Sequence, residues 1–204
     1  MKSHKLFLDV FNSHDRLHIY NEALTNWTTK RDPEWININN RHGENSLVID
    51  LLAKRIYKAM ATNWDIKINK NSGLELWINI NKRQGLHYDC DETLRQMTGL
   101  MRYPSLSGVY YSIVPSFGGD LILFKEAFDS AISNVYNKNI NKIELGNATK
   151  IKPTENSLIV FEPKIPHYVE EWDPRETRIS IAANLWIDEP INPKKPFSAL
   201  LSKL

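Results

Sequence analysis

Residues 157–187 read SLIVFEPKIPHYVEEWDPRETRISIAANLWI, and this stretch decides the fold. It contains three runs rich in β-branched and aromatic residues, at 157–161, 168–172 and 178–187, which are separated by segments that contain proline. Runs of this kind between turn residues predict antiparallel strands. The stretch therefore indicates a β-sandwich or β-barrel.

The same texture extends toward the N-terminus. Further strands are predicted at 74–80, 107–114 and 121–124. Gly118 and Gly119 predict a turn before the last of these, and Pro153–Asn156 predict another before residue 157. The segment 125–149 lacks the alternation of a strand, so it is expected to be an inserted loop or helix.

Two amphipathic helices are predicted before the strands. The first begins near Ser13, a residue type that favours helix N-termini, and the second begins near Ser46. In both segments the apolar residues recur every three or four positions, as they do on one face of a helix. These residues are Leu17, Tyr20, Leu24 and Trp27 in the first segment, and Val48, Leu51, Leu52, Ile56, Ala59 and Met60 in the second.

Length and composition favour one globular domain. The chain has 204 residues, of which 42% are hydrophobic and 25% charged, and both fractions are ordinary for such a domain. Residues 1–204 are expected to form a helical N-terminal part to about residue 70, a β core at about 72–188 and an irregular tail at 189–204. Three prolines in the tail, Pro190, Pro193 and Pro196, favour its irregularity.

Charge and sequence signals limit the partners and the location. The 26 basic and 24 acidic residues are interspersed, so nucleic acid is not expected as a partner. No apolar run is long enough to span a membrane, which favours a soluble, cytoplasmic protein. The final residues, Ser202-Lys203-Leu204, would direct the chain to peroxisomes only in a eukaryote. The oligomeric state is not encoded in any pattern.

Three residues form a candidate metal site. His87 and Asp89 stand two positions apart, so on an extended strand their side chains leave the same face. His167 offers a third ligand, and the single cysteine, Cys90, excludes a thiolate-rich site. Two histidines and one carboxylate on one face of an octahedral ion leave positions open, as non-haem Fe(II) sites require. Eleven residues after His167, Arg178 offers a fork of N–H donors suited to a carboxylate.

In this arrangement the sequence resembles the 2-oxoglutarate and Fe(II)-dependent oxygenases, in their prolyl-hydroxylase-like branch. Six features carry the resemblance between about residues 74 and 187: HYD at 87–89, LSGVYYSI at 106–113, GGDLILF at 118–124, IKPTENSLIVF at 151–161, PH at 166–167 and RISIAANLW at 178–186. The resemblance implies a mainly β fold, the double-stranded β-helix (jelly-roll, cupin-like), with flanking N-terminal helices.

The resemblance also implies the roles of individual residues. His87, Asp89 and His167 would bind iron and form the catalytic centre, and Arg178 would bind the distal carboxylate of 2-oxoglutarate. Tyr111 and Ser180 match positions that assist in binding this carboxylate. Dioxygen is then the second cosubstrate, with ascorbate as a supporting reductant.

The activity expected from the resemblance is hydroxylation of an unactivated C–H bond, with decarboxylation of 2-oxoglutarate to succinate. Asp89 favours hydroxylation over halogenation, because halogenating relatives have a small residue at this position. A peptide or protein side chain is the first expectation for the substrate, and a free amino acid or other small metabolite is the alternative. Residues 91–105 and 125–149 are candidates for binding it, whereas Trp77 is expected to be core packing.

Two other functions compete with this hypothesis. His14 and His18 stand four apart on the first predicted helix, with Asp15 between them, so they could chelate zinc in a metalloprotease-like site. Alternatively, the β core could be a non-catalytic module that keeps a metal for structure or sensing. Retention of both the metal ligands and Arg178 favours the oxygenase over the non-catalytic module.

Overall fold

The structure of the protein is a computed structural model, which describes residues 4–27, 34–38, 47–124 and 148–191. The helices are α1 (Ser13–Glu22), continued by the π-helical turn η1 (Ala23–Trp27), α2 (Leu47–Asn63) and α3 (Glu92–Thr98). The strands are β1 (His4–Phe7), β2 (Glu34–Asn37), β3 (Gly73–Ile80), β4 (Leu106–Ile113), β5 (Leu121–Phe124), β6 (Ala148–Ile151), β7 (Ser157–Phe161), β8 (His167–Val169) and β9 (Ile179–Trp186).

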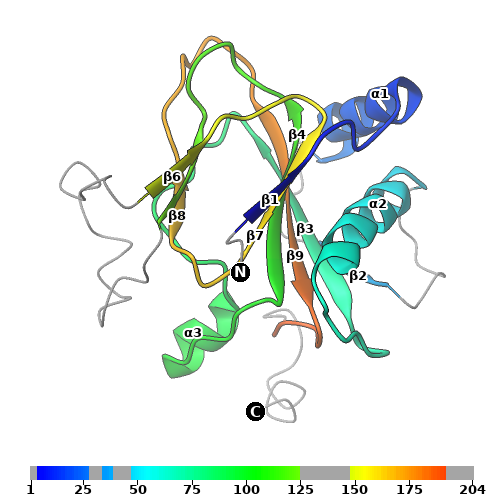
Figure 1. Ribbon diagram of the computed structural model, residues 1–204, viewed down its shortest axis with the longest axis vertical. Helices are drawn as coiled ribbons and strands as arrows, with labels where there is room; N and C mark the ends of the chain where they lie inside the picture. The colour runs from blue at the N-terminus through cyan, green and yellow to red at the C-terminus, as the bar shows by residue number, and fades with distance from the viewer. Residues whose placement is uncertain (1–3, 28–33, 39–46, 125–147, 192–204) are drawn as a thin grey trace.

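The strands form two antiparallel sheets that face each other across the site (Figure 1). The larger sheet has the order β1-β7-β4-β9-β3-β2, and the smaller has the order β6-β5-β8. Because strands from both ends of the described chain alternate in the larger sheet, residues far apart in sequence meet on one face. The predicted mainly β fold is confirmed, as an open pair of sheets.

The larger sheet buries one face against α1 and α2 (Figure 1). Alternate residues of a strand leave opposite faces, so Ile179, Ile181 and Ala183 of β9 join this helix-covered core. Ile56 of α2, one of the residues expected on its apolar face, is fully buried in the same core. Ser180 and the other intervening residues of β9 therefore face the smaller sheet.

A second core lies between the two sheets. It contains Leu121 and Leu123 of β5 together with Ile159 and Phe161 of β7. Tyr111 of β4 also belongs to it. This core fills one part of the space between the sheets with apolar side chains and leaves the polar groups of the site beside it.

The predicted turn at Gly118 and Gly119 brings two distant segments together. Both residues have positive φ, at 75° and 70°, where a side chain would be strained. A Cβ on Gly118 would also lie 2.3 Å from the carbonyl oxygen of Glu171. Gly118 can therefore form an isolated β-bridge with Trp172, which places this indole close to Arg178.

Several elements differ from the sequence predictions. The segment predicted to be helical also contributes β1 and β2, which pair with the edges of the larger sheet. Helix α1 is capped by Asn12, whose side chain accepts a bond from the N–H of Asp15 (2.8 Å), and not by Ser13. In the predicted 168–172 strand only residues up to 169 belong to β8, and α3 was not predicted.

Some predictions fall on residues outside the described ranges. These are the greater part of the predicted insertion, at 125–147, and the end of the tail, at 192–204, which includes Ser202-Lys203-Leu204. The last two residues assigned to the insertion, Ala148 and Thr149, begin β6.

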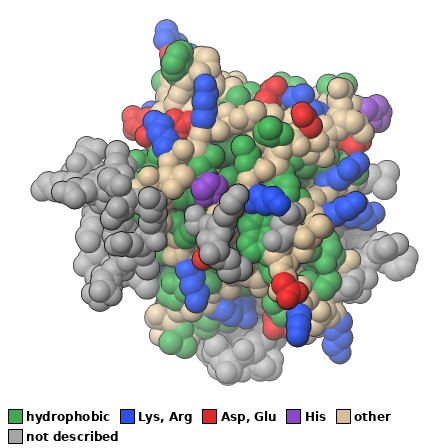
Figure 2. All heavy atoms as spheres, in the orientation of Figure 1, with side chains coloured by type: hydrophobic (Ala, Val, Ile, Leu, Met, Phe, Trp, Pro, Cys, Tyr) green, Lys and Arg blue, Asp and Glu red, His purple; other side chains and the backbone are tan. Residues whose placement is uncertain are grey.

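Surface properties are consistent with the composition. Within the described residues no helix combines the length and apolarity needed to cross a bilayer. Figure 2 shows basic and acidic side chains interspersed on the visible face, with apolar side chains between them.

Candidate metal and cosubstrate site

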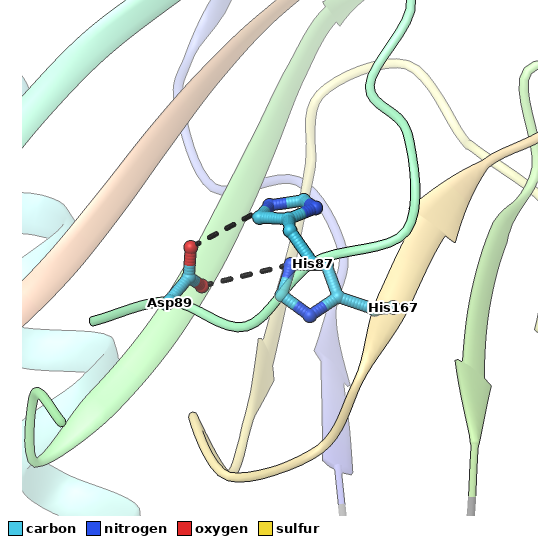
Figure 3. A group of neighbouring side chains, drawn as sticks. All are labelled: His87, Asp89 and His167. Atoms are coloured by element: carbon cyan, nitrogen blue, oxygen red, sulfur yellow. Dashed lines mark ion pairs between the residues drawn. The ribbon is translucent and has the colours of Figure 1, made fainter. Parts of the chain in front are cut away.

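Two backbone segments place the three predicted metal ligands together. His87 and His167 form an isolated antiparallel β-bridge, in which the N–H of each donates to the carbonyl oxygen of the other (both 3.0 Å). Directly opposed residues of an antiparallel pair project from the same face. His167 begins β8, whereas His87 and Asp89 lie in an extended segment beyond β3 and not in a regular strand as predicted. Figure 3 shows the three side chains converging.

The three side chains surround a common point. Nε2 of His87 lies 3.8 Å from Oδ1 of Asp89, and Nε2 of His167 lies 3.7 Å from Oδ2. These separations exceed hydrogen-bonding distance, so the three groups do not satisfy one another. Ligand atoms on one face of an octahedral ion at about 2.1 Å are about 3 Å apart, so a small contraction would seat an ion. Among the described residues this is the only cluster of three or more such side chains with ligand geometry.

Main-chain carbonyls orient both imidazoles. Nδ1 of His87 lies 2.7 Å from the carbonyl oxygen of Gly85, and Nδ1 of His167 lies 2.9 Å from that of Ile165. A carbonyl oxygen only accepts, so each Nδ1 carries the proton and donates it. Each Nε2 then carries a lone pair that can face the common point, and the amide Nε2 of Gln84 lies 3.4 Å from Nε2 of His87 and can donate to it. The bonds from Nδ1 are of the kind that orients a ligating histidine.

The charge of the triad suits a divalent cation. Burial, together with the neighbouring His87, lowers the pKa of His167 to about 4. His167 is therefore neutral near pH 7 and able to act as a ligand. A neutral His167 and a buried carboxylate leave negative charge at the triad, which a cation would compensate.

Arg178 lies beside the triad with its charge uncompensated. Its side chain is buried at 2% exposure, and it has no acidic partner among the described residues. Nη1 donates to the hydroxyl of Ser180 (2.9 Å), but Nε has no hydrogen-bond partner in the described part of the chain. Burial lowers the pKa of Arg178. A buried guanidinium in this state requires an anion, and a carboxylate matches its planar fork.

Tyr111 supplies a second unused donor at the same place. The Cζ atom of Arg178 lies 5.4 Å from the ring centroid of Tyr111 and 5.4 Å from that of Trp172. The hydroxyl of Tyr111 is buried and has no hydrogen-bond partner among the described residues. Burial raises its pKa to about 12, so it stays protonated and able to donate. Tyr111 and Ser180 therefore both lie beside Arg178.

One cavity joins the triad to Arg178. Its lining includes the three triad side chains together with Tyr111, Arg178 and Ser180. The lining also includes Trp77 and Asn79 of β3, which were not predicted as site residues. Trp77 was expected to be core packing, but it is half-buried and lines this cavity. Their spacing of two along a predicted strand was the signal that they share a face.

The other candidate ligands lie elsewhere. On exposed α1, the Nε2 atoms of His14 and His18 are 3.3 Å apart, and Nδ1 of His14 is 3.9 Å from Asp15. Helix α1 packs on the opposite face of the larger sheet from the triad (Figure 1). Cys90 is not a ligand of the cluster: its thiol contacts Glu92, and burial raises its pKa to about 12.

Comparisons with known proteins agree with this geometry. Residues 102–184, which include His167 and Arg178, match a family model described as a 2OG-Fe(II) oxygenase. The comparison with curated proteins returned no match.

Solved structures share the fold at low sequence identity. A prolyl-4-hydroxylase from Pseudomonas putida has a TM-score of 0.57 and 15% identity, over 94% of this chain and 88% of that one. HygX from Streptomyces hygroscopicus, solved with nickel and 2-oxoglutarate bound, has a TM-score of 0.59 and 12% identity, over 90% and 81%. The viral collagen prolyl hydroxylase of Paramecium bursaria Chlorella virus-1 has 0.53 and 15%, over 90% of each chain.

Proposed function

We propose that the chain is a 2-oxoglutarate and Fe(II)-dependent oxygenase that hydroxylates an unactivated C–H bond, first of all on a peptide or protein side chain. One observation carries the proposal: a His-Asp-His cluster that includes a buried carboxylate, and a buried arginine without an acidic partner among the described residues, line the same cavity. The first requires a cation and the second requires an anion. A divalent metal chelated by a dicarboxylate satisfies both requirements.

Each residue then has a defined task. His87, Asp89 and His167 would hold Fe(II) on one face and leave the positions toward the cavity open. Arg178 would pair with the distal carboxylate of 2-oxoglutarate, and Ser180 and Tyr111 would donate hydrogen bonds to it. When bound, Fe(II), 2-oxoglutarate and dioxygen supply the oxidising chemistry, which yields succinate, carbon dioxide and a hydroxylated substrate.

The protein contributes orientation and exclusion of water. The carbonyls of Gly85 and Ile165 hold the ligand nitrogens in place without further rearrangement. Apolar side chains, including Leu121 and Val169, also line the cavity. A dry cavity protects a strong oxidant from side reactions. No acid or base pair is needed for this role.

Substrate-dependent formation of succinate tests the proposal. The protein is loaded with Fe(II) under nitrogen, air is admitted with 2-oxoglutarate, and succinate is measured with a panel of peptides and small molecules. We expect succinate that depends on Fe(II) and disappears in Asp89→Ala and His167→Ala. His14→Ala is the matched control, because it removes an exposed histidine outside the cluster. Equal turnover in wild type and Asp89→Ala would contradict the proposal.

The panel includes small molecules for a specific reason. The fold is shared with prolyl hydroxylases and also with HygX, whose structure has been solved with hygromycin B bound. A free amino acid or other small metabolite is therefore the second candidate for the substrate. Acceleration of succinate formation by one class alone would decide between them.

A further inference from the structure

A row of polar and aromatic side chains crosses the inner face of the larger sheet, at the end opposite Arg178. In the register of the strands, Trp35 of β2 lies opposite Glu75 of β3, Glu75 lies opposite Asn184 of β9, and Asn184 lies opposite Ser107 of β4. Opposed residues in antiparallel strands leave the same face. Glu75 also alternates with Trp77, which lines the cavity, so the row faces the site.

Two members of this row have unused hydrogen-bonding capacity. Asn184 and Ser107 are 3% and 0% exposed, yet Asn184 Oδ1 and Ser107 Oγ have no hydrogen-bond partner in the described part of the chain. A buried polar atom left without a partner costs about 1–3 kcal/mol. Both atoms can accept hydrogen bonds, so a ligand that carries several N–H donors would satisfy them together.

Glu75 gives the row negative charge without a cation beside it. Its Oε2 accepts a bond from the indole Nε1 of Trp186 (3.0 Å), and no ion pair to Glu75 is present among the described residues. Burial, together with the charges of Asp89 and Asp91, raises the pKa of Glu75 to about 7. The carboxyl therefore lies in a region of negative potential, to which the charge of the metal ligand Asp89 contributes.

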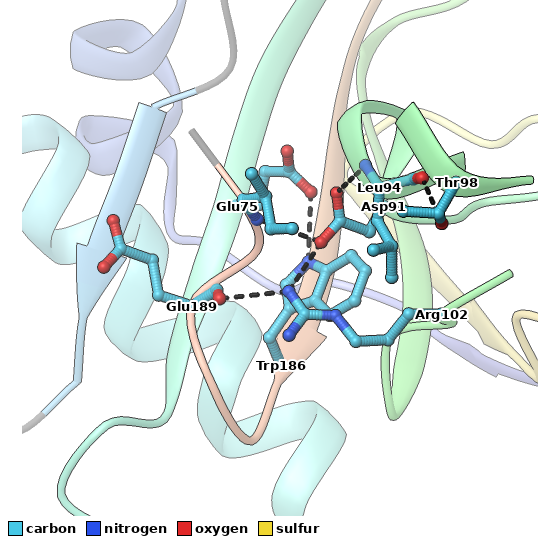
Figure 4. Close-up of polar contacts among 8 residues, drawn as sticks. Glu75, Asp91, Leu94, Thr98, Arg102, Trp186 and Glu189 are labelled. Atoms are coloured by element: carbon cyan, nitrogen blue, oxygen red, sulfur yellow. Dashed lines mark hydrogen bonds and ion pairs between the residues drawn. The ribbon is translucent and has the colours of Figure 1, made fainter. Parts of the chain in front are cut away.

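Arg102, a basic group beside Trp186, belongs to another interaction. Arg102 lies over the ring of Trp186, with Cζ 5.3 Å from the centroid, and its Nη2 donates to Asp91 Oδ2 (2.6 Å) (Figure 4). Nη2 also bonds the carbonyl oxygen of Glu189 (3.0 Å). The charge of Arg102 is thus balanced by Asp91. Arg102 forms no ion pair with Glu75.

Aromatic rings border the same position. A Cβ on Gly73 would lie 2.4 Å from the ring of Trp35, so this indole covers Gly73. Gly73 in turn lies opposite Trp186 in the β3–β9 ladder. The two indoles therefore lie on β2 and β9, the strands on either side of β3, and both are close to Glu75. Faces of tryptophan rings attract cations and also accommodate the aliphatic stem that carries them.

We propose that Trp35, Glu75, Ser107, Asn184 and Trp186, here called the acceptor row, bind a cationic nitrogen group of the substrate, a primary ammonium or a guanidinium group. This inference rests on the proposed function and specifies its substrate class. The three oxygen-bearing side chains accept the N–H bonds, Glu75 balances the charge, and the indoles contact the adjoining methylene groups. A cationic nitrogen group on an aliphatic stem is found in lysine and arginine side chains and in small amines.

The spacing along β9 places the metal between two binding groups, Arg178 with Ser180 at one end and the acceptor row at the other. Asn184 is four residues beyond Ser180 on β9, which corresponds to about 14 Å along an antiparallel strand. The cosubstrate carboxylate would be held at the Ser180 end and the substrate cation at the Asn184 end. The Trp77 and Ala182 positions line the cavity between them. A carbon a few bonds from the cationic nitrogen would therefore be presented to the triad.

A polar hollow continues outward from the acceptor row and has room for the rest of a substrate. Its volume is about 400 Å³, within the range of ligand pockets. It is lined by Trp35, Asn37, Asn71, Arg102, Asp188 and Glu189. Trp35 belongs to both the hollow and the acceptor row, so the two are continuous.

Binding of matched cationic and neutral probes tests this inference. The protein is loaded with Mn(II) and 2-oxoglutarate under nitrogen, and calorimetry measures binding of Nα-acetyl-lysine methylamide and of its neutral counterpart, Nα-acetyl-norleucine methylamide. Free lysine against norleucine and arginine against citrulline form further pairs, which separate peptide from small-molecule sources. We expect at least tenfold tighter binding of the cationic member in one or more pairs. Equal binding in every pair would overturn the proposal.

Variants locate the preference. Glu75→Gln should abolish the preference for the cation. Asn184→Leu keeps Glu75 and should weaken cation binding severalfold. This second variant tests the proposal if Glu75→Gln fails to fold. Glu155→Gln is the matched control, because this exposed carboxylate pairs with Arg16 at a distance from the cavity. Retention of the full preference in Glu75→Gln would also overturn the proposal.

The same samples separate this inference from the proposed function. If Mn(II) and 2-oxoglutarate bind but no cation preference is found, the acceptor row is wrong and the oxygenase proposal stands. If the cation binds through Glu75 but 2-oxoglutarate does not bind, the acceptor row stands and the oxygenase proposal fails.

Discussion

At the scale of single residues, Arg178 is the charge on which binding of 2-oxoglutarate should depend. Removing it deletes a charge-assisted, forked interaction, so Arg178→Gln should weaken 2-oxoglutarate binding by about 2–3 kcal/mol, roughly 30- to 150-fold, while metal binding remains. Ser180→Ala, which removes one hydroxyl, should cost about 1 kcal/mol. Titration of the Mn(II)-loaded protein with 2-oxoglutarate measures both effects.

Arg175 provides the control for this substitution. It is an exposed arginine three residues before Arg178, and it pairs with Asp173 outside the cavity. Arg175→Gln should bind 2-oxoglutarate as the wild type does. Loss of metal in Arg178→Gln with unchanged affinity for 2-oxoglutarate would reverse the assigned roles.

Glu75 makes stability depend on pH. Its pKa is about 7 in the folded protein against 4.5 for an unperturbed glutamate. Between these values the folded state holds a proton that the unfolded state has released. The stabilisation from the protonated carboxyl is therefore complete below pH 4.5 and is lost as the pH rises through about 7, with a total of about 3 kcal/mol.

Glu75→Gln removes this dependence, because glutamine stays neutral and can still accept from Trp186. Urea denaturation of the metal-free protein between pH 5 and 8 should show the difference between variant and wild type growing in favour of the variant. Parallel stability profiles would mean that Glu75 has an ordinary pKa.

At the scale of secondary structure elements, Asp91 links three segments. Its Oδ1 caps α3 through the N–H of Leu94 (3.0 Å), and its Oδ2 accepts from Arg102 and from the N–H of Ile191 (2.9 Å). Figure 4 shows these contacts around the end of β9. The side chain is 1% exposed. Asp91→Ala should therefore destabilise the protein by about 3 kcal/mol, since a cap and a largely buried ion pair are lost together.

Urea denaturation measures this loss, and Asp173→Ala is the control because Asp173 forms its ion pair with Arg175 on the surface. Because Asp91 is two residues from Asp89, the variant should also bind metal more weakly than the wild type does. A stability unchanged from that of the control would show that the cap and the pair are replaceable.

The sequence predicted the longer elements, the four-residue strand β5 and the individual ligands, but not β1, β2, β6 or α3. Strand β5 (LILF) is apolar throughout, whereas β1 (HKLF) and β2 (EWIN) mix polar and apolar residues over four positions, too few for a period to be visible. Helix α3 has seven residues and depends on the cap by Asp91. Such elements form because a neighbouring strand or side chain supplies their partners.

The site divides in the same way. His87, Asp89 and His167 were predicted from residue types at recognisable spacings, and the structure brings them together. Glu75 and Asn184 were not predicted, because their proximity depends on the β3–β9 register. Pairing between strands that are more than 100 residues apart leaves no local pattern in the sequence.

At the scale of the whole molecule, ligand binding should raise thermal stability in a coupled way. A ligand at 100 times its dissociation constant adds about 2.7 kcal/mol, which corresponds to about 5–10 °C in a domain of this size. The metal should produce such a shift alone. 2-Oxoglutarate should produce a further shift mainly when metal is present, because it contacts both the metal and Arg178.

Thermal unfolding with Mn(II), with 2-oxoglutarate and with both measures this coupling. His167→Ala should show neither the shift from metal nor the further shift from 2-oxoglutarate. An equal shift from 2-oxoglutarate with and without metal would indicate that it binds elsewhere on the molecule.

The hydrogen bonds that orient the two imidazoles bear on how the protein tolerates mutation. Their acceptors are the carbonyls of residues 85 and 165, and a main-chain carbonyl persists whichever side chain stands there. Substitutions at residues 85 and 165 therefore leave the carbonyl acceptors of the metal half of the cavity in place. The other half of the cavity is built from the side chains of Arg178, Ser180 and Tyr111, and a substitution there removes the interacting group itself. Descendants of this chain should therefore diversify in the acids and substrates they accept long before they lose the ion.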